Sequence, residues 1–137
     1  PVKLTANPET QILEAYPLPG NGSGDFANLL DADGFIELPE NENFVLEYVT
    51  DKVWGGYNYY QGNAQSLIQI NTDFPIYISR AIDLASHEGY PGHHVYMTLI
   101  EENLVNNKGW MEFSVYPLFS PLSLIAEGSA NYGIDVA

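Results

Sequence analysis

The sequence predicts an α+β fold dominated by helices, and two observations support this. Two stretches rich in β-forming residues, 44–50 and 66–72, come before three stretches with helical periodicity. Hydrophobic residues make up 45% and aromatic residues 13% of the 137 residues, which is enough for a buried core and argues against disorder. We expect an irregular segment and linker over residues 1–43. We also expect a core over 44–137 that is truncated at its C-terminal end within a helical run.

The predicted strands lie on either side of an aromatic stretch. The strand at 66–71 directly precedes the first helix. It is either the sheet edge to which an extended ligand adds as a further strand or an ordinary strand of the sheet. The stretch 57–62 combines tyrosines with polar residues. It either packs a loop against the core or brings the hydroxyl of Tyr59 or Tyr60 to a functional site.

The three helical stretches are bounded by recognisable signals. Asp73 is a suitable cap for the first, which carries its apolar residues at helical spacing and ends near residue 88. The second runs over 95–107 and stops at an Asn-Asn-Lys-Gly sequence. The third starts at Ser120 or Ser123 and continues through residue 132.

The charge balance is strongly acidic. Asp and Glu number 18 against 4 Lys and Arg, for a formal net charge of −14. Such a chain repels phosphate backbones and anionic lipid surfaces, so we expect no nucleic-acid partner. No apolar run is long enough for a membrane-spanning segment, and the absence of cysteine excludes disulfides and thiolate zinc sites.

All three histidines lie in the stretch 87–94, and Glu88 follows the first of them. Imidazole nitrogen and carboxylate oxygen are the donors of a catalytic zinc. In the His-Glu-x-x-His arrangement both histidines face one side of a helix. Here Pro91 occupies the place of the second histidine, which leaves His93 and His94 as candidates.

The spacing requires a break in the helix if two histidines are to share a metal. On an unbroken helix His94 lies within about 20° of His87 but roughly 10.5 Å along the axis, and His93 points about 120° away. Pro91 and the glycines on both sides of it favour a break. Such a break would allow His93 to reach the metal, and His94 stays an alternative ligand. The structural alternative is a helix break with capping histidines and no metal.

Several features resemble a bacterial family of zinc metallopeptidases, the domain of unknown function 885 (DUF885). The family's histidine motif reads His-Glu-x-x-Pro-Gly-His-His, and the likeness covers this chain from about residue 57 to its end. The shared features are the stretch 87–94, Tyr59-Tyr60, Asn71-Thr72 and the stretch 127–132. The resemblance implies a mostly helical zincin-like core of the gluzincin type with a small β-sheet.

The resemblance also implies a zinc site and a reaction. One zinc ion is held by His87, His93 and Glu127, and the apolar and small neighbours of Glu127 independently favour a carboxylate that needs a cation. Glu88 acts as general base towards a zinc-bound water. The expected function is a zinc-dependent hydrolase, a metallopeptidase acting on a peptide or small amide substrate.

Two further residues complete the expected catalytic set. Tyr132, with Tyr90 and Tyr60 as alternatives, stabilises the oxyanion, and His94 donates a hydrogen bond to the substrate or intermediate. The alternatives are a non-catalytic metal-binding or structural module of a larger protein and an amidohydrolase of non-peptide amides. A bacterial protein that is secreted, periplasmic or lipid-anchored is expected if a signal precedes residue 1. The oligomeric state stays open.

Overall fold

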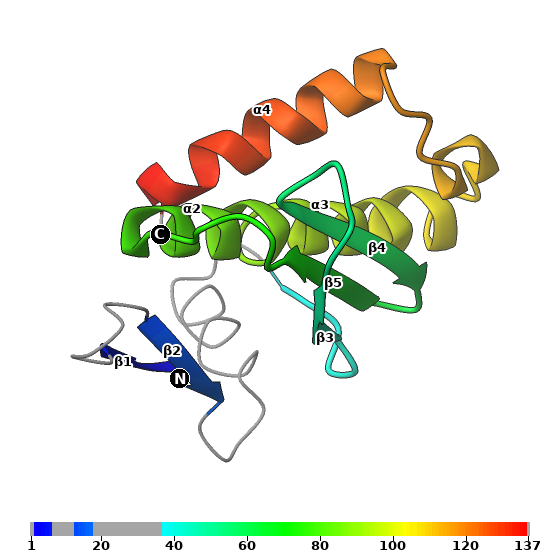
Figure 1. Cartoon of the computed structure of the whole chain (residues 1–137). Helices are drawn as coiled ribbons and strands as arrows, with labels where there is room; N and C mark the ends of the chain where they lie inside the picture. Colours follow the sequence, from blue (N-terminus) through cyan, green and yellow to red (C-terminus); the bar gives the residue numbers. More distant parts are fainter. Residues whose placement is uncertain (1, 7–12, 18–36, 137) are drawn as a thin grey trace.

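The computed structural model describes residues 2–6, 13–17 and 37–136. The main sheet has three strands, and Figure 1 shows that helices cover it on one side. The strands are β1 (Val2–Ala6), β2 (Leu13–Pro17), β3 (Asn43–Val49), β4 (Gly56–Gly62) and β5 (Gln65–Asn71). The helical elements are α2 (Ile78–Glu88), α3 (His93–Ile100), the π-helix η1 (Glu101–Asn106), the 3₁₀ helix η2 (Met111–Ser114) and α4 (Pro121–Val136).

Strands β1 and β2 lie in the segment that the sequence predicted to be irregular. They pair antiparallel, with Val2 opposite Pro17 and Ala6 opposite Leu13. Residues 1, 7–12 and 18–36 of the predicted irregular segment and linker lie outside the described residues.

The main sheet has the strand order β3-β5-β4. Strand β3 is parallel to β5, with Asn43 opposite Gln65, and β4 is antiparallel to β5. Strand β5 is therefore central. The edge position considered from the sequence is wrong, and the alternative of an ordinary sheet strand is confirmed. The alternate residues Ser66 and Ile68 of β5 are buried, because they lie on the face of the sheet that the helices cover. The edge next to the helices is β4, which the sequence presented as an aromatic stretch.

A tight turn joins β4 to β5 and is tied to the helices. Asn63 and Ala64 both have positive φ, 54° and 55°, as a two-residue hairpin turn requires. Their main-chain N–H groups donate to the Glu101 carboxylate, at 2.9 Å from Asn63 and 3.1 Å from Ala64. The hairpin is thus fixed to the C-terminal end of α3.

The predicted break between the first two helices is confirmed. Helix α2 ends at Glu88 and α3 starts at His93. At Gly92 the chain comes so close that a Cβ atom would lie 1.8 Å from the main-chain oxygen of His87, so only glycine fits. The start of α2 was predicted less well, because it begins at Ile78 while Asp73 accepts a hydrogen bond from the Asp51 N–H at 2.6 Å.

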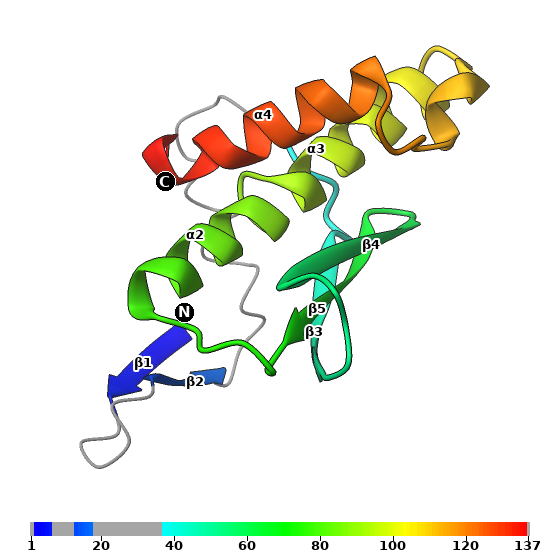
Figure 2. The ribbon, with the colours of Figure 1, turned by 45° about the horizontal axis from the view of Figure 1, so that its top comes forward.

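Helix α4 packs along α2 and α3, as Figure 2 shows. Its start matches the predicted signal, since the Ser120 hydroxyl accepts a hydrogen bond from the Ser123 N–H at 3.1 Å. Helix α4 contacts the helix break at Gly133. A Cβ atom at this position would lie 3.2 Å from the Pro91 ring, so a glycine allows the close packing. This packing brings α4 over the histidine stretch.

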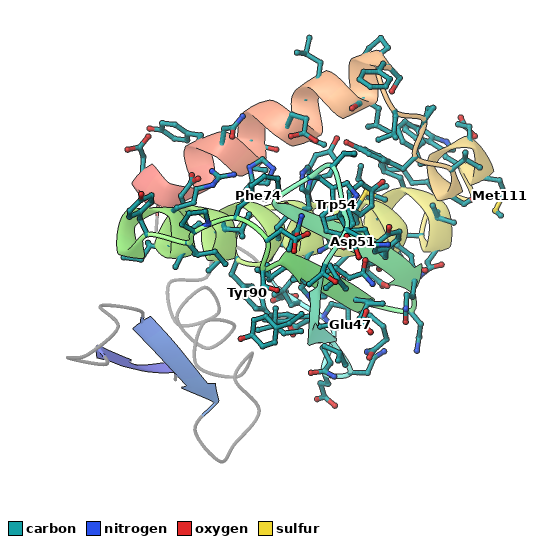
Figure 3. All side chains as sticks on the ribbon, in the orientation of Figure 1. Glu47, Asp51, Trp54, Phe74, Tyr90 and Met111 are labelled. Carbon is teal, nitrogen blue, oxygen red and sulfur yellow. The ribbon has the colours of Figure 1, made fainter. Side chains whose placement is uncertain are left out.

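The core lies between the sheet and the helices. Figure 3 shows side chains filling this space, with Tyr90 at the side of β3, where its ring lies 5.5 Å from that of Phe44. The buried apolar residues are Ala64, Ile68, Leu84, Tyr90, Val95, Ile100, Ala126 and Ala130. The fold is a small α+β fold with a three-stranded sheet, and the predicted mostly helical zincin-like core of the gluzincin type is wrong. One reason is that 56–62 forms a full strand.

Candidate metal centre

Three residues from three helices meet at the helix break. The Nε2 atom of His87, at the end of α2, lies 3.3 Å from Glu127 Oε2, and the Nε2 atom of His93, at the start of α3, lies 3.3 Å from Glu127 Oε1. The two imidazole rings stand edge to face with centroids 4.7 Å apart. One ligand atom from each of the three residues lies within 4.8 Å of the others.

These separations fit a zinc ion. Tetrahedral zinc with bonds of about 2.0–2.1 Å holds neighbouring donor atoms roughly 3.3 Å apart. Both histidine–glutamate distances have this value, although each histidine faces a different oxygen of the carboxylate. Two imidazoles and one carboxylate are also a common donor set of zinc sites that keep one position open. The Glu127 side chain is 47% exposed, which leaves such a position accessible.

Electrostatics favour the neutral form of one histidine. Burial and the neighbouring His87 lower the pKa of His93, against the opposing effect of Glu127. A metal binds imidazole only in its unprotonated form, so a lowered pKa keeps His93 ready to bind at neutral pH.

Glu88 lies beside these three residues and lines the same cavity. It is only 5% exposed. Burial and the Glu127 carboxylate raise the pKa of Glu88 to about 7, while Arg80 and a hydrogen bond from the main chain of Asn58 oppose the shift. The side chain of Asn58 donates to the main-chain oxygen of Glu88 at 2.7 Å and so joins β4 to the end of α2. Glu88 is therefore held at the site by the edge strand.

Tyr57 lies near Glu88 and Glu127, and the sequence did not single out this tyrosine as a candidate. Burial raises the pKa of Tyr57, and Tyr59, Tyr116, Glu88 and Glu127 raise it further. The Tyr57 and Tyr59 rings lie 4.5 Å apart. The alternation of a β-strand from residue 56 onwards would have identified Tyr57, because residues two apart share a face.

The three candidate ligands open into a cavity of about 580 Å³. Strand β4, helix α3 and the segment before α4 form its walls. Among the residues that line it are Tyr57, Tyr60, Met97, Glu101, Phe113 and Tyr116. Tyr60 lies at the far end, where its hydroxyl donates to the Glu101 carboxylate.

The structure does not bring His94 or Tyr132 to the candidate ligands. His94 is 0% exposed and lies in the core, with its Nδ1 atom 2.8 Å from the Ser66 hydroxyl and its ring edge-on to Phe44 and Tyr90. Tyr132 is 64% exposed and does not line the cavity. It lies five residues beyond Glu127, which on a helix is about 140° round the axis.

Comparisons with known proteins relate the beginning of the chain to one family. Residues 1–47 match the model of the MoeA C-terminal region (domain IV). A stretch of 42 residues is 45% identical to a molybdopterin molybdenumtransferase of Synechocystis sp. and covers 31% of this chain and 10% of that protein. No solved structure matches the chain. Among the described residues, no helix has the length and apolar character needed to cross a membrane.

These matches correct the identification made from the sequence. They relate residues 1–47 to the C-terminal region of molybdopterin molybdenumtransferases, and the identification as a DUF885 metallopeptidase is wrong. The expected zinc-dependent hydrolase activity on peptides or other amides is therefore wrong, and the non-catalytic alternative gains no clear support from them. The matched residues end within β3, so the candidate metal centre lies outside them.

Proposed function

We propose that the chain binds one zinc ion through His87, His93 and Glu127, in a protein related through residues 1–47 to molybdopterin molybdenumtransferases. The observation that supports the metal site is the pair of 3.3 Å separations between Glu127 and the two histidines. The Glu127 carboxylate faces both imidazoles, and burial lowers the pKa of His93, which favours the unprotonated form that a metal binds.

Each of the three residues has a distinct part in this site. His87 and His93 offer imidazole nitrogen donors from the two sides of the helix break, and Glu127 offers the charge that a divalent cation needs. Zinc bound by these residues would supply a Lewis acid at a position that faces the cavity. Glu88 holds a carboxyl group next to that position, with a pKa raised to about 7 that allows it to gain or lose a proton near neutrality.

Metal content of the purified chain tests the site. We expect near-stoichiometric zinc by mass spectrometry in the unmodified chain and its loss in His87→Gln and Glu127→Gln. Glu102→Gln is the matched control, because Glu102 lies on η1 and is not one of the three clustered residues. Circular dichroism verifies that the variants are folded. Failure of the unmodified chain to take up zinc, or unchanged zinc content in His87→Gln, contradicts the proposal.

The relationship of residues 1–47 supports a second proposal, a contribution to transferring molybdenum to molybdopterin. The supporting observation is the 45% identity over 42 residues. A chimera of the Synechocystis protein, in which this chain's stretch replaces the matching one, provides the test. We expect molybdenum transfer to be retained, whereas a control with a scrambled stretch loses it. Equal loss of molybdenum transfer in the chimera and in the scrambled control rejects this role.

A further inference from the structure

The cavity at the candidate metal centre extends along one helix face. His93, Met97, Glu101 and Val105 follow one another at intervals of four residues through α3 and η1, and all four line the cavity. Residues at this spacing share a face of a helix. The eight residues from His93 to Glu101 correspond to a rise of roughly 12 Å. The cavity thus has the metal centre at one end and the Glu101 carboxylate at the other.

The opposite wall is aromatic. It is formed by β4, from which Tyr57, Tyr59 and Tyr60 line the cavity. Phe113 and Tyr116 contribute further rings from the segment between η1 and α4. Aromatic faces carry negative charge density and attract organic cations, so this wall suits a ligand that is partly apolar and partly cationic.

Within the part of the chain that the structure describes, no cation pairs with the charge of Glu101. Its carboxylate accepts hydrogen bonds from the Tyr60 hydroxyl and from the N–H groups of Asn63 and Ala64, which are all neutral donors. Oε1 accepts one of these bonds and retains capacity for another donor. Among the described residues that line the cavity, none is Lys or Arg. Although burial opposes it, these hydrogen bonds lower the pKa of Glu101 and keep it ionised.

The two ends of the cavity differ once a metal is bound. A divalent ion balances the charges of Glu127 and Glu88, which lie next to each other at one end. Glu101, two helical turns away, stays unbalanced. A ligand that fits both ends carries a metal-binding oxygen group at one end and a cation at the other.

We propose that this cavity binds elongated organic amines, with a metal-binding head at the zinc ion and an ammonium or guanidinium group at Glu101. The inference rests on the proposed zinc site and adds the class of ligand to it. Glu101 acts as the specificity-determining residue, and the tyrosine wall of β4 covers the connecting chain.

Two matched ligands test this inference on the zinc-loaded chain: octanehydroxamic acid and its ω-amino analogue. Both offer the same head to the metal, and only the second offers a cation. We expect the amine to bind about tenfold tighter, the gain typical of a hydrogen bond to a charged group. Glu101→Gln removes this preference without changing the affinity of the uncharged ligand, and Glu102→Gln keeps it. Raising the salt concentration reduces the preference in the unmodified chain.

The outcomes separate this inference from the proposed function. Zinc content is measured on the same samples, so a chain without zinc overturns the metal site, and the ligand inference with it. Equal affinities of the two ligands for the zinc-loaded chain overturn the ligand inference alone. If the preference for the amine persists in Glu101→Gln, or does not respond to salt, a group other than Glu101 binds the amine. This result also overturns the ligand inference alone.

Discussion

His87 and Glu127 place Nε2 and Oε2 3.3 Å apart, although α3, η1 and η2 separate them along the chain. The contact depends on α4 crossing the break between α2 and α3. A second histidine from the far side of that break makes the same approach to the same carboxylate. Glu127 is thus the residue through which three helices are joined, and it is the natural point at which to test the centre.

Replacing Glu127 by Gln removes the charged donor while keeping the shape of the side chain. We expect zinc affinity to fall at least tenfold, since loss even of outer-shell partners costs roughly 10–100-fold. Competition with a chromophoric chelator measures it. Thermal unfolding of the metal-free protein provides the control, and an affinity equal to that of the unmodified chain argues against Glu127 as a ligand.

Gly92→Ala tests the close approach at the helix break. A Cβ atom there would lie 1.8 Å from the main-chain oxygen of His87, so the two segments must separate. We expect the free energy of unfolding to fall by more than about 3 kcal/mol. Gly128→Ala in α4 is the control, because a Cβ atom there meets nothing within 4 Å, and it should stabilise the protein by about 1 kcal/mol. Urea unfolding measures both, and equal effects would contradict this account of the break.

Ser66→Ala tests the position of His94 in the core. The change removes the 2.8 Å partner of the His94 Nδ1 atom and leaves a buried polar atom unpaired. We expect a loss of about 1–3 kcal/mol in the free energy of unfolding, with zinc content unchanged. Ser114→Ala, at an exposed position, serves as control. A large drop in zinc content with little loss of stability would instead tie His94 to the metal.

The Glu101 carboxylate makes stability depend on pH in acid. Burial acts to raise its pKa, but hydrogen bonds from Tyr60, Asn63 and Ala64 outweigh burial, and the pKa lies below the ordinary value of 4.5. A lowered pKa in the folded state means that this contribution is present above the unfolded pKa and is lost as the pH falls through the folded one. Unfolding free energies measured from neutral pH to below pH 4.5 should therefore fall less steeply for Glu101→Gln. Identical slopes would show that the hydrogen bonds do not favour the ionised form.

The histidine stretch 87–94 predicted the local structure correctly but the family wrongly. The stretch 87–94 correctly predicted a helix break, because proline and glycine act locally on the main chain. The family inferred from the same stretch was wrong, since residues 1–47 match the C-terminal region of molybdopterin molybdenumtransferases. Residues 1–43 contain prolines and a glycine-rich stretch but little periodicity, and we recognised no family from them.

The sequence by itself determined the chemistry that is available: three histidines around a break, an adjacent glutamate, and a further carboxylate among small residues on a later helix. Only the tertiary structure decided which of these meet. His93 and His94 are neighbours that point about 100° apart on a helix, so the angle of the break selects His93 for Glu127 and His94 for Ser66. Likewise, the pairing of β4 at the sheet edge sets Tyr57 beside Glu88, whereas Tyr132 faces outward. Local periodicity carries no information on such choices, because they depend on packing between elements far apart in the chain.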